Sequence, residues 1–353
     1  MTAKLIQDSV SLLRDLIRIP SFSKEESQTG DTIERFLQQR GVRTYRKVNN
    51  IWAYNKFFDP VKPTILLNSH HDTVKPNTGY TRNPFSPDIE ADILYGLGSN
   101  DAGGCLVSLI AAFLHFYPQE QLNYNFCIAA TAEEEISGAN GLELVIPDLG
   151  PLDFAIVGEP TGMQLAVAER GLMVLDCVAH GKSGHAARDE GDNAIYKALK
   201  DIEWFISYRF PKESEEFGPI KMSVTIIHAG SQHNVVPATC EFVADIRVTD
   251  AYRNEEVLEI IRQHVSCEVK PRSMRLKPSS IPKDHAVVQA GLTLGRTTYG
   301  SPTTSDQALL DIPSLKLGPG DSARSHMADE FIYLSEIDEG VRLYIDILDK
   351  VVK

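Results

Sequence analysis

Four short, continuous apolar runs of strand length constrain the fold of this sequence more than any other feature. The runs are residues 64–67, 126–130, 154–157 and 314–317. Strands that are buried on both faces have this composition, which is typical of a parallel sheet covered by helices. Helical stretches lie between or after the runs, notably residues 103–116 and 336–351, the second with Ser335 as a candidate N-cap. The alternation predicts an α/β fold with a doubly wound, mostly parallel sheet.

A block in the middle of the chain has a different order of elements. Between residues 171 and 280 we expect a strand, a helix, two strands and a second helix, which resembles a ferredoxin-like, split βαβ sandwich. The last buried strand comes only after this block. We therefore expect residues 1–170 and 281–353 to form one discontinuous sheet domain, with residues 171–280 inserted into it.

Charge and cysteine content exclude several classes of protein. The chain has 353 residues and a net charge of −13, and no basic patch is visible, which disfavours binding to nucleic acid or to anionic membranes. We find neither a secretory signal nor an apolar stretch of membrane-spanning length. The five cysteines are scattered and contain no CxxC pair, so we expect neither a disulfide framework nor a thiolate metal site. This pattern predicts a cytoplasmic protein.

Acidic and imidazole side chains follow the apolar runs. They are His70, His71 and Asp72 after the first run, Glu133, Glu134 and Glu135 after the second, Glu159 after the third, and His326 beyond the fourth, with Asp101 preceding a helix. One such residue is most often a helix cap or a solvated loop residue. The whole set meets at one sheet edge, where isolated charges would be costly without pairing or a cation. Nitrogen and carboxylate donors suit zinc, with cobalt or manganese as substitutes, and the number of donors suffices for two ions and a general base.

These motifs resemble those of the dinuclear zinc amidohydrolases, a family that includes acetylornithine deacetylase, succinyl-diaminopimelate desuccinylase, aminoacylase and carboxypeptidase G. The resemblance covers nearly the whole chain and implies two Zn²⁺ per subunit. It implies metal ligands at His70, Asp101, Glu135, Glu159 and His326, with Asp101 bridging the two ions. It also implies that Asp72 orients His70 and that Glu134 is the general base, which leaves Glu133 without a role.

The resemblance extends to the inserted block, which corresponds to the family's lid and dimerisation domain. Residues 181–187, GKSGHAA, are similar to the lid motif, so His185 would polarise the substrate carbonyl, often across a dimer interface. Asn234 and Arg247 match positions that contact the substrate, and a guanidinium suits a carboxylate. A loop amide and a strand-edge ion pair are the open alternatives for these two residues. Thr304 and Ser305 are expected to line the pocket.

The function implied is hydrolysis of the amide bond in a small N-acyl amino acid by a homodimer joined through the insert. The sequence as a whole most resembles acetylornithine deacetylase. This resemblance implies that the substrate is N-acetyl or N-succinyl ornithine or citrulline, in arginine biosynthesis. A succinyl-diaminopimelate desuccinylase, a dipeptidase and a non-catalytic metal- or peptide-binding relative are the alternatives. One departure affects the subgroup: many members carry Asp-x-Lys-Gly-Gly, whereas this chain has Asp101-Ala102-Gly103-Gly104 without the lysine.

Overall fold

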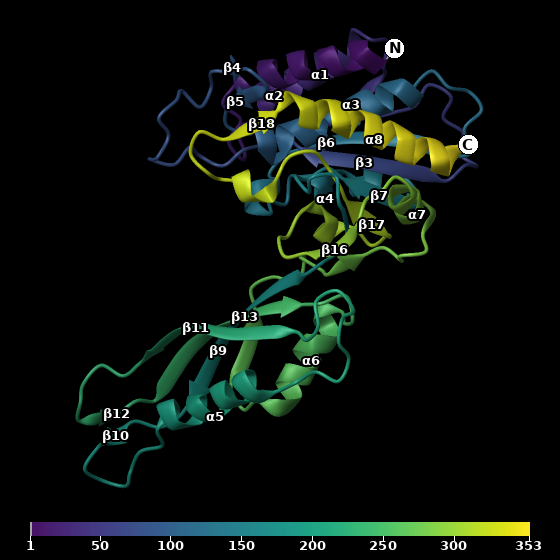
Figure 1. Ribbon diagram of the computed structural model, residues 1–353. Helices are drawn as coiled ribbons and strands as arrows, with labels where there is room; N and C mark the ends of the chain where they lie inside the picture. The colour runs from purple at the N-terminus through teal and green to yellow at the C-terminus, as the bar shows by residue number, and fades with distance from the viewer. Residues whose placement is uncertain (1) are drawn as a thin grey trace. The chain divides into compact units, whose positions relative to one another are not determined.

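The chain leaves one folded unit near residue 167 and returns to it near residue 280. The computed structural model describes residues 2–353 (Figure 1). The first unit comprises Met1–Val167, Ser280–Tyr299 and Ser305–Lys353, and the second comprises Ala168–Ser279 and Gly300–Thr304. Each unit has a hydrophobic core of its own.

The four apolar runs form four adjacent parallel strands at the centre of a nine-stranded sheet. These strands are, in spatial order, β6 (Asn125–Thr131), β3 (Thr64–His70), β7 (Phe154–Val157) and β17 (Ser314–Lys316). The remaining strands of this sheet are β1 (Thr44–Lys47), β2 (Asn50–Tyr54), β8 (Leu165–Glu169), β15 (Ser279–Ser280) and β16 (Thr298–Ser301). Strands β1 and β2 extend one side of the parallel group in antiparallel fashion. The expected α/β class with a mostly parallel sheet is confirmed.

Helices cover both faces of this sheet. The larger core lies on one face and includes side chains of α1 (Thr2–Ile17), α2 (Ser27–Gln38), α3 (Gly104–Phe116), α7 (Ala286–Thr293) and α8 (Leu334–Val352). The smaller core, on the other face, includes α4 (Leu142–Val145) and the short helix η3 (Ile146–Asp148). Coverage of both faces explains why the central strands are continuously apolar.

Helix α8 begins earlier than the sequence suggests, so the prediction of Ser335 as N-cap is wrong. The helix starts at Leu334, and the Glu336 carboxylate accepts the N–H of Tyr333, which is the N-cap residue. Ser335 instead donates its hydroxyl to Asp92. Asp92 lies between β4 (Ile89–Glu90) and β5 (Ile93–Tyr95), which form a small sheet with β18 (Phe331–Tyr333).

The second unit is a four-stranded antiparallel sheet packed against two helices. The strands in spatial order are β11 (Lys221–Ala229), β13 (Thr239–Val248), β9 (Gly171–His180) and β14 (Glu268–Pro271). The helices are α5 (Ala194–Ser207) and α6 (Asn254–His264), so the order along the chain is the βαββαβ of a ferredoxin-like sandwich. Buried and partly exposed residues alternate along β9, as expected for a sheet with one face covered. A separate pair, β10 (Gly184–His185) and β12 (Val235–Val236), completes the unit.

No helix among residues 2–353 combines the length and the apolar character that a membrane span requires. All five cysteines are free thiols.

Candidate metal centre

His70 is the last residue of β3, and its imidazole is buried among carboxylates. Its Nε2 lies 3.3 Å from Asp101 Oδ1, 3.7 Å from Glu159 Oε1 and 3.8 Å from Glu134 Oε2. On the other side of the ring, Nδ1 lies 3.0 Å from the backbone oxygen of Asp72 and 3.4 Å from its carboxylate. A hydrogen bond from Nδ1–H to Asp72 leaves the Nε2 lone pair free to face the carboxylates, which is the usual arrangement of a metal-binding histidine.

His326 forms a second group with Glu135 and shares Asp101 with the first. Its Nε2 lies 2.9 Å from Glu135 Oε2 and 3.7 Å from Asp101 Oδ2. The two oxygens of Asp101 therefore face different histidines. Two sets of donors, each with atoms within 4.8 Å of one another, result: His70, Asp101 and Glu159, and Asp101, Glu135 and His326. This is the arrangement that a carboxylate bridging two ions requires.

Asp101 lies in the short turn η1 (Ser99–Gly103), directly before α3, and its own backbone is not helical, with φ −117° and ψ 100°. The preceding residue Gly98 has φ +74°, and a Cβ there would lie 2.6 Å from Thr73 Cγ2. Only glycine fits this close approach at positive φ. The tight turn brings Asp101 to the edge of the sheet where β3 ends.

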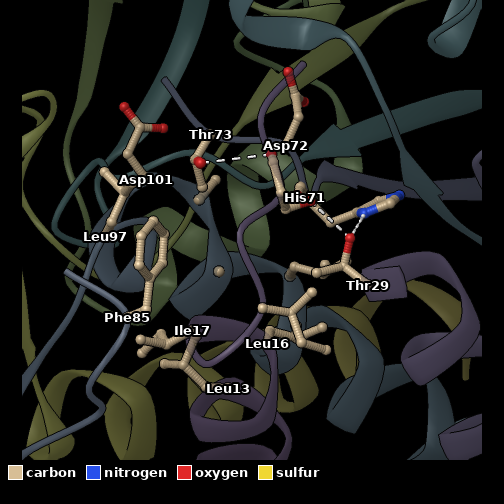
Figure 2. A pocket seen from close by; sticks show the side chains of 16 residues that line it. Leu13, Leu16, Ile17, Thr29, His71, Asp72, Thr73, Phe85, Leu97 and Asp101 are labelled. Carbon is tan, nitrogen blue, oxygen red and sulfur yellow. Dashed lines mark hydrogen bonds between the residues drawn. The ribbon is translucent and has the colours of Figure 1, made fainter. Parts of the chain in front are cut away.

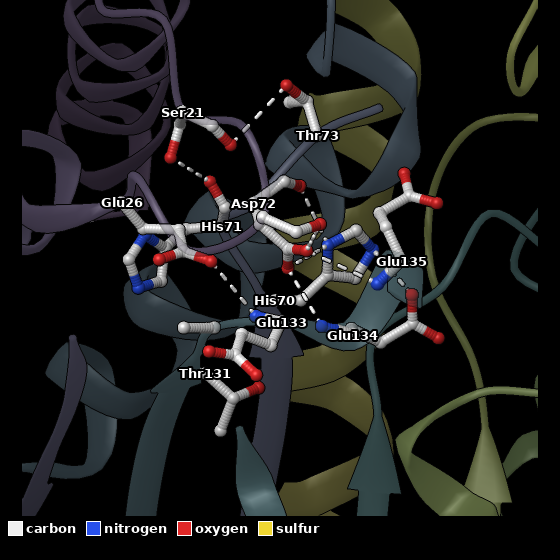
Figure 3. Close-up of polar contacts among 12 residues, drawn as sticks. Ser21, Glu26, His70, His71, Asp72, Thr73, Thr131, Glu133, Glu134 and Glu135 are labelled. Atoms are coloured by element: carbon white, nitrogen blue, oxygen red, sulfur yellow. Dashed lines mark hydrogen bonds and ion pairs between the residues drawn. The ribbon is translucent and has the colours of Figure 1, made fainter. Parts of the chain in front are cut away.

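Asp72 holds the loop that carries the glutamates (Figure 3). Its Oδ1 accepts the N–H of Glu134 at 3.1 Å, and its Oδ2 accepts the N–H of Glu135 at 3.2 Å. Oδ2 also accepts the Ser23 hydroxyl at 2.7 Å. Asp72 thus positions both His70 and the two glutamates that follow β6, whereas the sequence motifs implied only the orientation of His70.

Glu133 points away from the donor groups. It has φ +55°, and its carboxylate accepts the Asn140 side-chain amide at 2.9 Å. Its backbone N–H is accepted by Glu26 at 3.2 Å, and Glu26 also accepts the Asn49 amide at 2.7 Å. Glu133 and Glu26 therefore fix the shape of the loop, and Glu134 is the member of the run that lies beside His70 without belonging to either donor set.

His71 fills a structural position behind the centre. Its Nδ1 lies 2.9 Å from Thr29 Oγ1, and its Nε2 lies 2.9 Å from the backbone oxygen of Asn49. Burial lowers the pKa of His71 to about 4, which keeps the ring neutral. Beside it is a cavity of about 20 Å³, lined largely by apolar side chains of α1, Phe85 and Leu97 (Figure 2). A space of this size holds at most a water molecule, so it is too small to be a substrate pocket.

The carboxylates of the centre are strongly desolvated. Burial raises the pKa of Glu134 well above its usual value, and burial together with the Asp101 carboxylate raises that of Glu159 to about 8. Burial opposes the charge on His70, but Glu134 and Asp101 outweigh it and raise the pKa of His70 well above its usual value. The hydrogen bond to Glu135 raises the pKa of His326 to about 9. The crowding of buried carboxylates around the two histidines therefore favours the binding of a cation.

The donor set fits a divalent cation. Glu159 Oε1 is buried and has no hydrogen-bond partner within the described part of the chain, although it faces His70 Nε2. An unsatisfied buried carboxylate oxygen is costly, and an ion between Glu159, His70 and Asp101 would satisfy it. Imidazole nitrogen with carboxylate oxygen is a donor chemistry that suits zinc, cobalt or manganese.

The candidate residues of the second unit make contacts of their own. His185 ends β10, and its Nδ1 accepts the N–H of Ala187 at 3.1 Å. Asn234 lies beside it, since its backbone oxygen accepts the N–H of Ala186 at 3.0 Å. Arg247, in β13, binds the Asp245 carboxylate of the same strand through two nitrogens at 2.8 and 3.1 Å. The sequence left an ion pair open at this residue, although β13 is an interior strand and not an edge of the sheet.

Thr304 and Ser305 lie on either side of a boundary between the units. Thr304 ends the short segment that groups with the second unit, and Ser305 resumes the first unit. The Ser305 hydroxyl accepts the N–H of Gln307 and caps the short helix η4 (Asp306–Leu309). The substrate contacts expected of both residues stay predictions.

An open α/β sheet with two overlapping donor groups, and a further carboxylate beside them, is an arrangement that suits a metal-dependent hydrolase. Comparison with known families agrees with this class. The model of peptidase family M20/M25/M40 matches residues 66–350, so the chain belongs to this family and is a hydrolase.

Curated relatives match along the whole chain. The succinyl-diaminopimelate desuccinylase of Halorhodospira halophila is 25% identical over 373 residues, covering 96% of this chain and 97% of its own. The enzyme of the same name from Xylella fastidiosa is 27% identical, with coverage of 96% and 97%. The expectation that acetylornithine deacetylase is the nearest subgroup finds no support in these comparisons.

Solved structures share the fold. Aminopeptidase PepT from Bacillus cereus superposes with a TM-score of 0.77 at 18% identity, covering 98% of both chains. The Bacillus subtilis YXEP protein, described as a dinuclear metal binding peptidase of the M20 family, has a TM-score of 0.74 at 16% identity, covering 99% of this chain and 100% of its own. At these identities the likeness concerns the fold alone.

Proposed function

We propose that the protein hydrolyses the amide bond of an N-succinyl amino acid such as N-succinyl-diaminopimelate. The relatives that match along the whole chain carry the name of that activity, which supports the substrate class. The observation that carries the reaction type is the position of Glu134, a buried carboxylate 3.8 Å from His70 and beside both donor groups. This proposal replaces ornithine or citrulline as the first substrate to test.

Two divalent ions, with zinc first among them, complete the proposed centre. His70 and Glu159 would hold one ion, Glu135 and His326 the other, and Asp101 would bridge them. When bound, such ions polarise a carbonyl oxygen and lower the pKa of water.

Glu134 is the proposed general base. It takes a proton from the attacking water while the water oxygen forms a bond to the amide carbonyl carbon. The carbon–nitrogen bond then breaks, and Glu134 gives the proton to the leaving amine. The products are a carboxylic acid, succinate in this case, and the free amine. Burial raises the pKa of Glu134, and a raised pKa suits a carboxylate that must accept a proton and then release it.

Substrate contacts are assigned to the second unit and to the segment that follows it. In this proposal His185 polarises the carbonyl oxygen, and Asn234 and Arg247 bind the polar ends of the substrate. Thr304 and Ser305 line the pocket. Arg247 must exchange its Asp245 partner for a substrate carboxylate, or keep it and act indirectly; the variant Arg247→Lys, which loses the two-point geometry, separates these cases through its KM.

A second copy of the chain is the proposed partner of the second unit. Strand β11 is at the edge of its sheet, and Ile226 and Ile227 on it are 45% and 49% exposed. Helix α5 exposes Tyr196, Leu199 and Ile206. An edge strand with free backbone groups beside exposed apolar side chains is typical of a surface that becomes buried in a protein–protein interface. In this proposal the β11 edge of one protomer pairs with the β11 edge of the second.

The decisive experiment compares two neighbouring glutamates. Glu134→Gln is expected to retain bound metal and lose hydrolysis of N-succinyl-diaminopimelate by at least about 100-fold, the contribution of a general base. Glu133→Gln controls for perturbation of the loop, because the Glu133 carboxylate binds Asn140 in the same loop and lies outside both donor groups, so a smaller loss is expected. Amine release is measured with zinc, with cobalt and with chelator. An active Glu134→Gln protein would refute the role of this residue.

Peptide hydrolysis is the second candidate, favoured by the description of the family as peptidases. The bond and the proposed machinery are the same, so the substrate panel includes dipeptides and N-acetyl and N-succinyl ornithine and citrulline. Turnover of a dipeptide without turnover of any acyl amino acid would select the peptidase. Metal binding without hydrolysis of any member would select a non-catalytic relative.

A further inference from the structure

Glu330 is a buried acidic residue to which the proposed reaction assigns no role. It is 1% exposed. Its carboxylate accepts three backbone N–H groups at 2.9 Å each: Oε2 from Gly98, and Oε1 from Asn100 and Asp101. One carboxylate that accepts three backbone N–H groups holds those groups in a fixed relation to one another. Glu330 therefore fixes the turn on which Asp101 lies.

The direction of the Asp101 side chain depends on this turn. Asp101 donates its own N–H to Glu330, and its two carboxylate oxygens lie 3.3 Å from His70 Nε2 and 3.7 Å from His326 Nε2. A small rotation of the Asp101 backbone would change both distances. Because Asp101 is the one residue common to both donor groups, its orientation decides how well they form together.

The segment that carries Glu330 also carries His326, four residues earlier. His326 is on an irregular part of the chain, with φ +61° and a side chain that is 55% exposed, so packing alone does not hold it. Its backbone oxygen accepts the Asn77 amide at 3.0 Å, and the Asp329 carboxylate accepts the N–H groups of Thr81 and Arg82. The segment is thus fixed along its length, and Glu330 is the point at which it joins the Asp101 turn.

We propose that Glu330 is a positioning residue that brings Asp101 and His326 into register and thereby sets the affinity of the group Asp101, Glu135 and His326 for a divalent ion. This inference rests on the proposed function insofar as that group holds a metal. Glu330 itself lies behind Asp101 and contributes no donor to either group.

Glu330→Gln is the direct test. The glutamine side chain has nearly the same shape, but its amide has one acceptor oxygen and an NH₂ donor. At least one of the three N–H groups therefore loses its acceptor. Residues that orient metal ligands typically change metal affinity by about 10- to 100-fold when replaced. We expect the dissociation constant of the second ion to rise by that factor, with a smaller change for the ion held by His70 and Glu159.

The readout is metal binding and not turnover. Equilibrium dialysis of metal-free protein against buffered Co²⁺ gives the number of ions bound at each free concentration. Cobalt spectra report the geometry of each site, and the rise in melting temperature on adding metal gives a third measure. A merely structural role for Glu330 would lower the melting temperature of the metal-free protein and leave the dissociation constants unchanged.

Asp201→Asn is the matched control. Asp201 is also buried, at 5% exposure, and its carboxylate accepts the N–H groups of Ser266 and Cys267 at 2.9 and 3.0 Å, all within the second unit. This variant is expected to lose stability and to bind both ions with wild-type affinity. If Glu330→Gln fails to fold, Glu330→Asp replaces it, because the shorter side chain keeps both carboxylate oxygens but cannot reach all three N–H groups. This variant too is expected to bind the second ion more weakly.

Wild-type affinity for both ions in the Glu330 variants would overturn the inference and leave the proposed function intact. Equal weakening in the Asp201 and Glu330 variants would also overturn it, because general destabilisation would then explain the loss. A wild-type protein that binds no divalent ion would overturn the proposed function as well.

Discussion

Replacement of Asp72 by asparagine tests how the centre is held together. The Asp72 carboxylate accepts the N–H groups of Glu134 and Glu135, at 3.1 and 3.2 Å, and the Ser23 hydroxyl. Asparagine has one acceptor oxygen, so one of the two N–H groups must face an NH₂ group. A hydrogen bond to a charged group contributes about 1.5–3 kcal/mol. The opening of the glutamate loop should therefore become about 10- to 100-fold more frequent, since 1.36 kcal/mol corresponds to a factor of ten.

Hydrogen exchange measures this opening directly. In the Asp72→Asn protein we expect amide exchange in the segment after β6 to accelerate by that factor, while exchange in β9 of the second unit is unchanged. Ser23→Ala is the matched control, because it removes a donor from the same carboxylate and leaves both loop N–H groups their acceptors. Exchange in Asp72→Asn that equals the exchange in Ser23→Ala would refute the assignment of Asp72 as the anchor of this loop.

Three further predictions concern charge, pH and assembly. Glu159→Gln should stabilise the metal-free protein, because it removes one of several crowded buried carboxylates, and it should weaken metal binding. In urea unfolding, the variant should be more stable than the wild type without zinc and should gain less stability when zinc is added. Burial lowers the pKa of His285, whose Nδ1 accepts the N–H of Val287 at the start of α7. The contribution of neutral His285 to the free energy of unfolding is present above pH 6.5 and is lost as the pH falls below that value. In His285→Asn, the free energy of unfolding should therefore fall less steeply below pH 6.5 than in the wild type, and it should be unchanged above neutral pH. Ile227→Lys should yield monomers in light scattering, whereas Val61→Lys, at an equally apolar but 90% exposed position of the first unit, should not.

The central sheet could be predicted because its strands are buried on both faces. Residues 64–67 and 154–157, for instance, are continuously apolar, and such a composition has few alternatives once helical stretches lie between the runs. The side chains that follow these strands could be located for the same reason, since the carboxyl ends of parallel strands meet at one edge. The edge strand β1 carries no such pattern, because its residues are mixed in polarity and only partly buried.

The residues that position the centre could not be predicted. Glu330 acts on backbone groups more than 220 positions earlier in the chain, and Glu26 acts on the N–H of Glu133, 107 positions later. A single acidic residue whose partners are backbone amides leaves no spacing pattern in the sequence. The second role of Asp72, as the acceptor for the glutamate loop, is hidden for the same reason.

Titration of zinc into metal-free protein, with amine release from N-succinyl-diaminopimelate followed in the same samples, tests the central claim most directly. The account predicts no hydrolysis without metal, hydrolysis that rises as ions bind and that saturates at no more than two ions per chain, and none at any zinc concentration in Glu134→Gln. Hydrolysis that persists unchanged in metal-free protein, or fully loaded protein that releases no amine from any acyl amino acid or dipeptide, would contradict it.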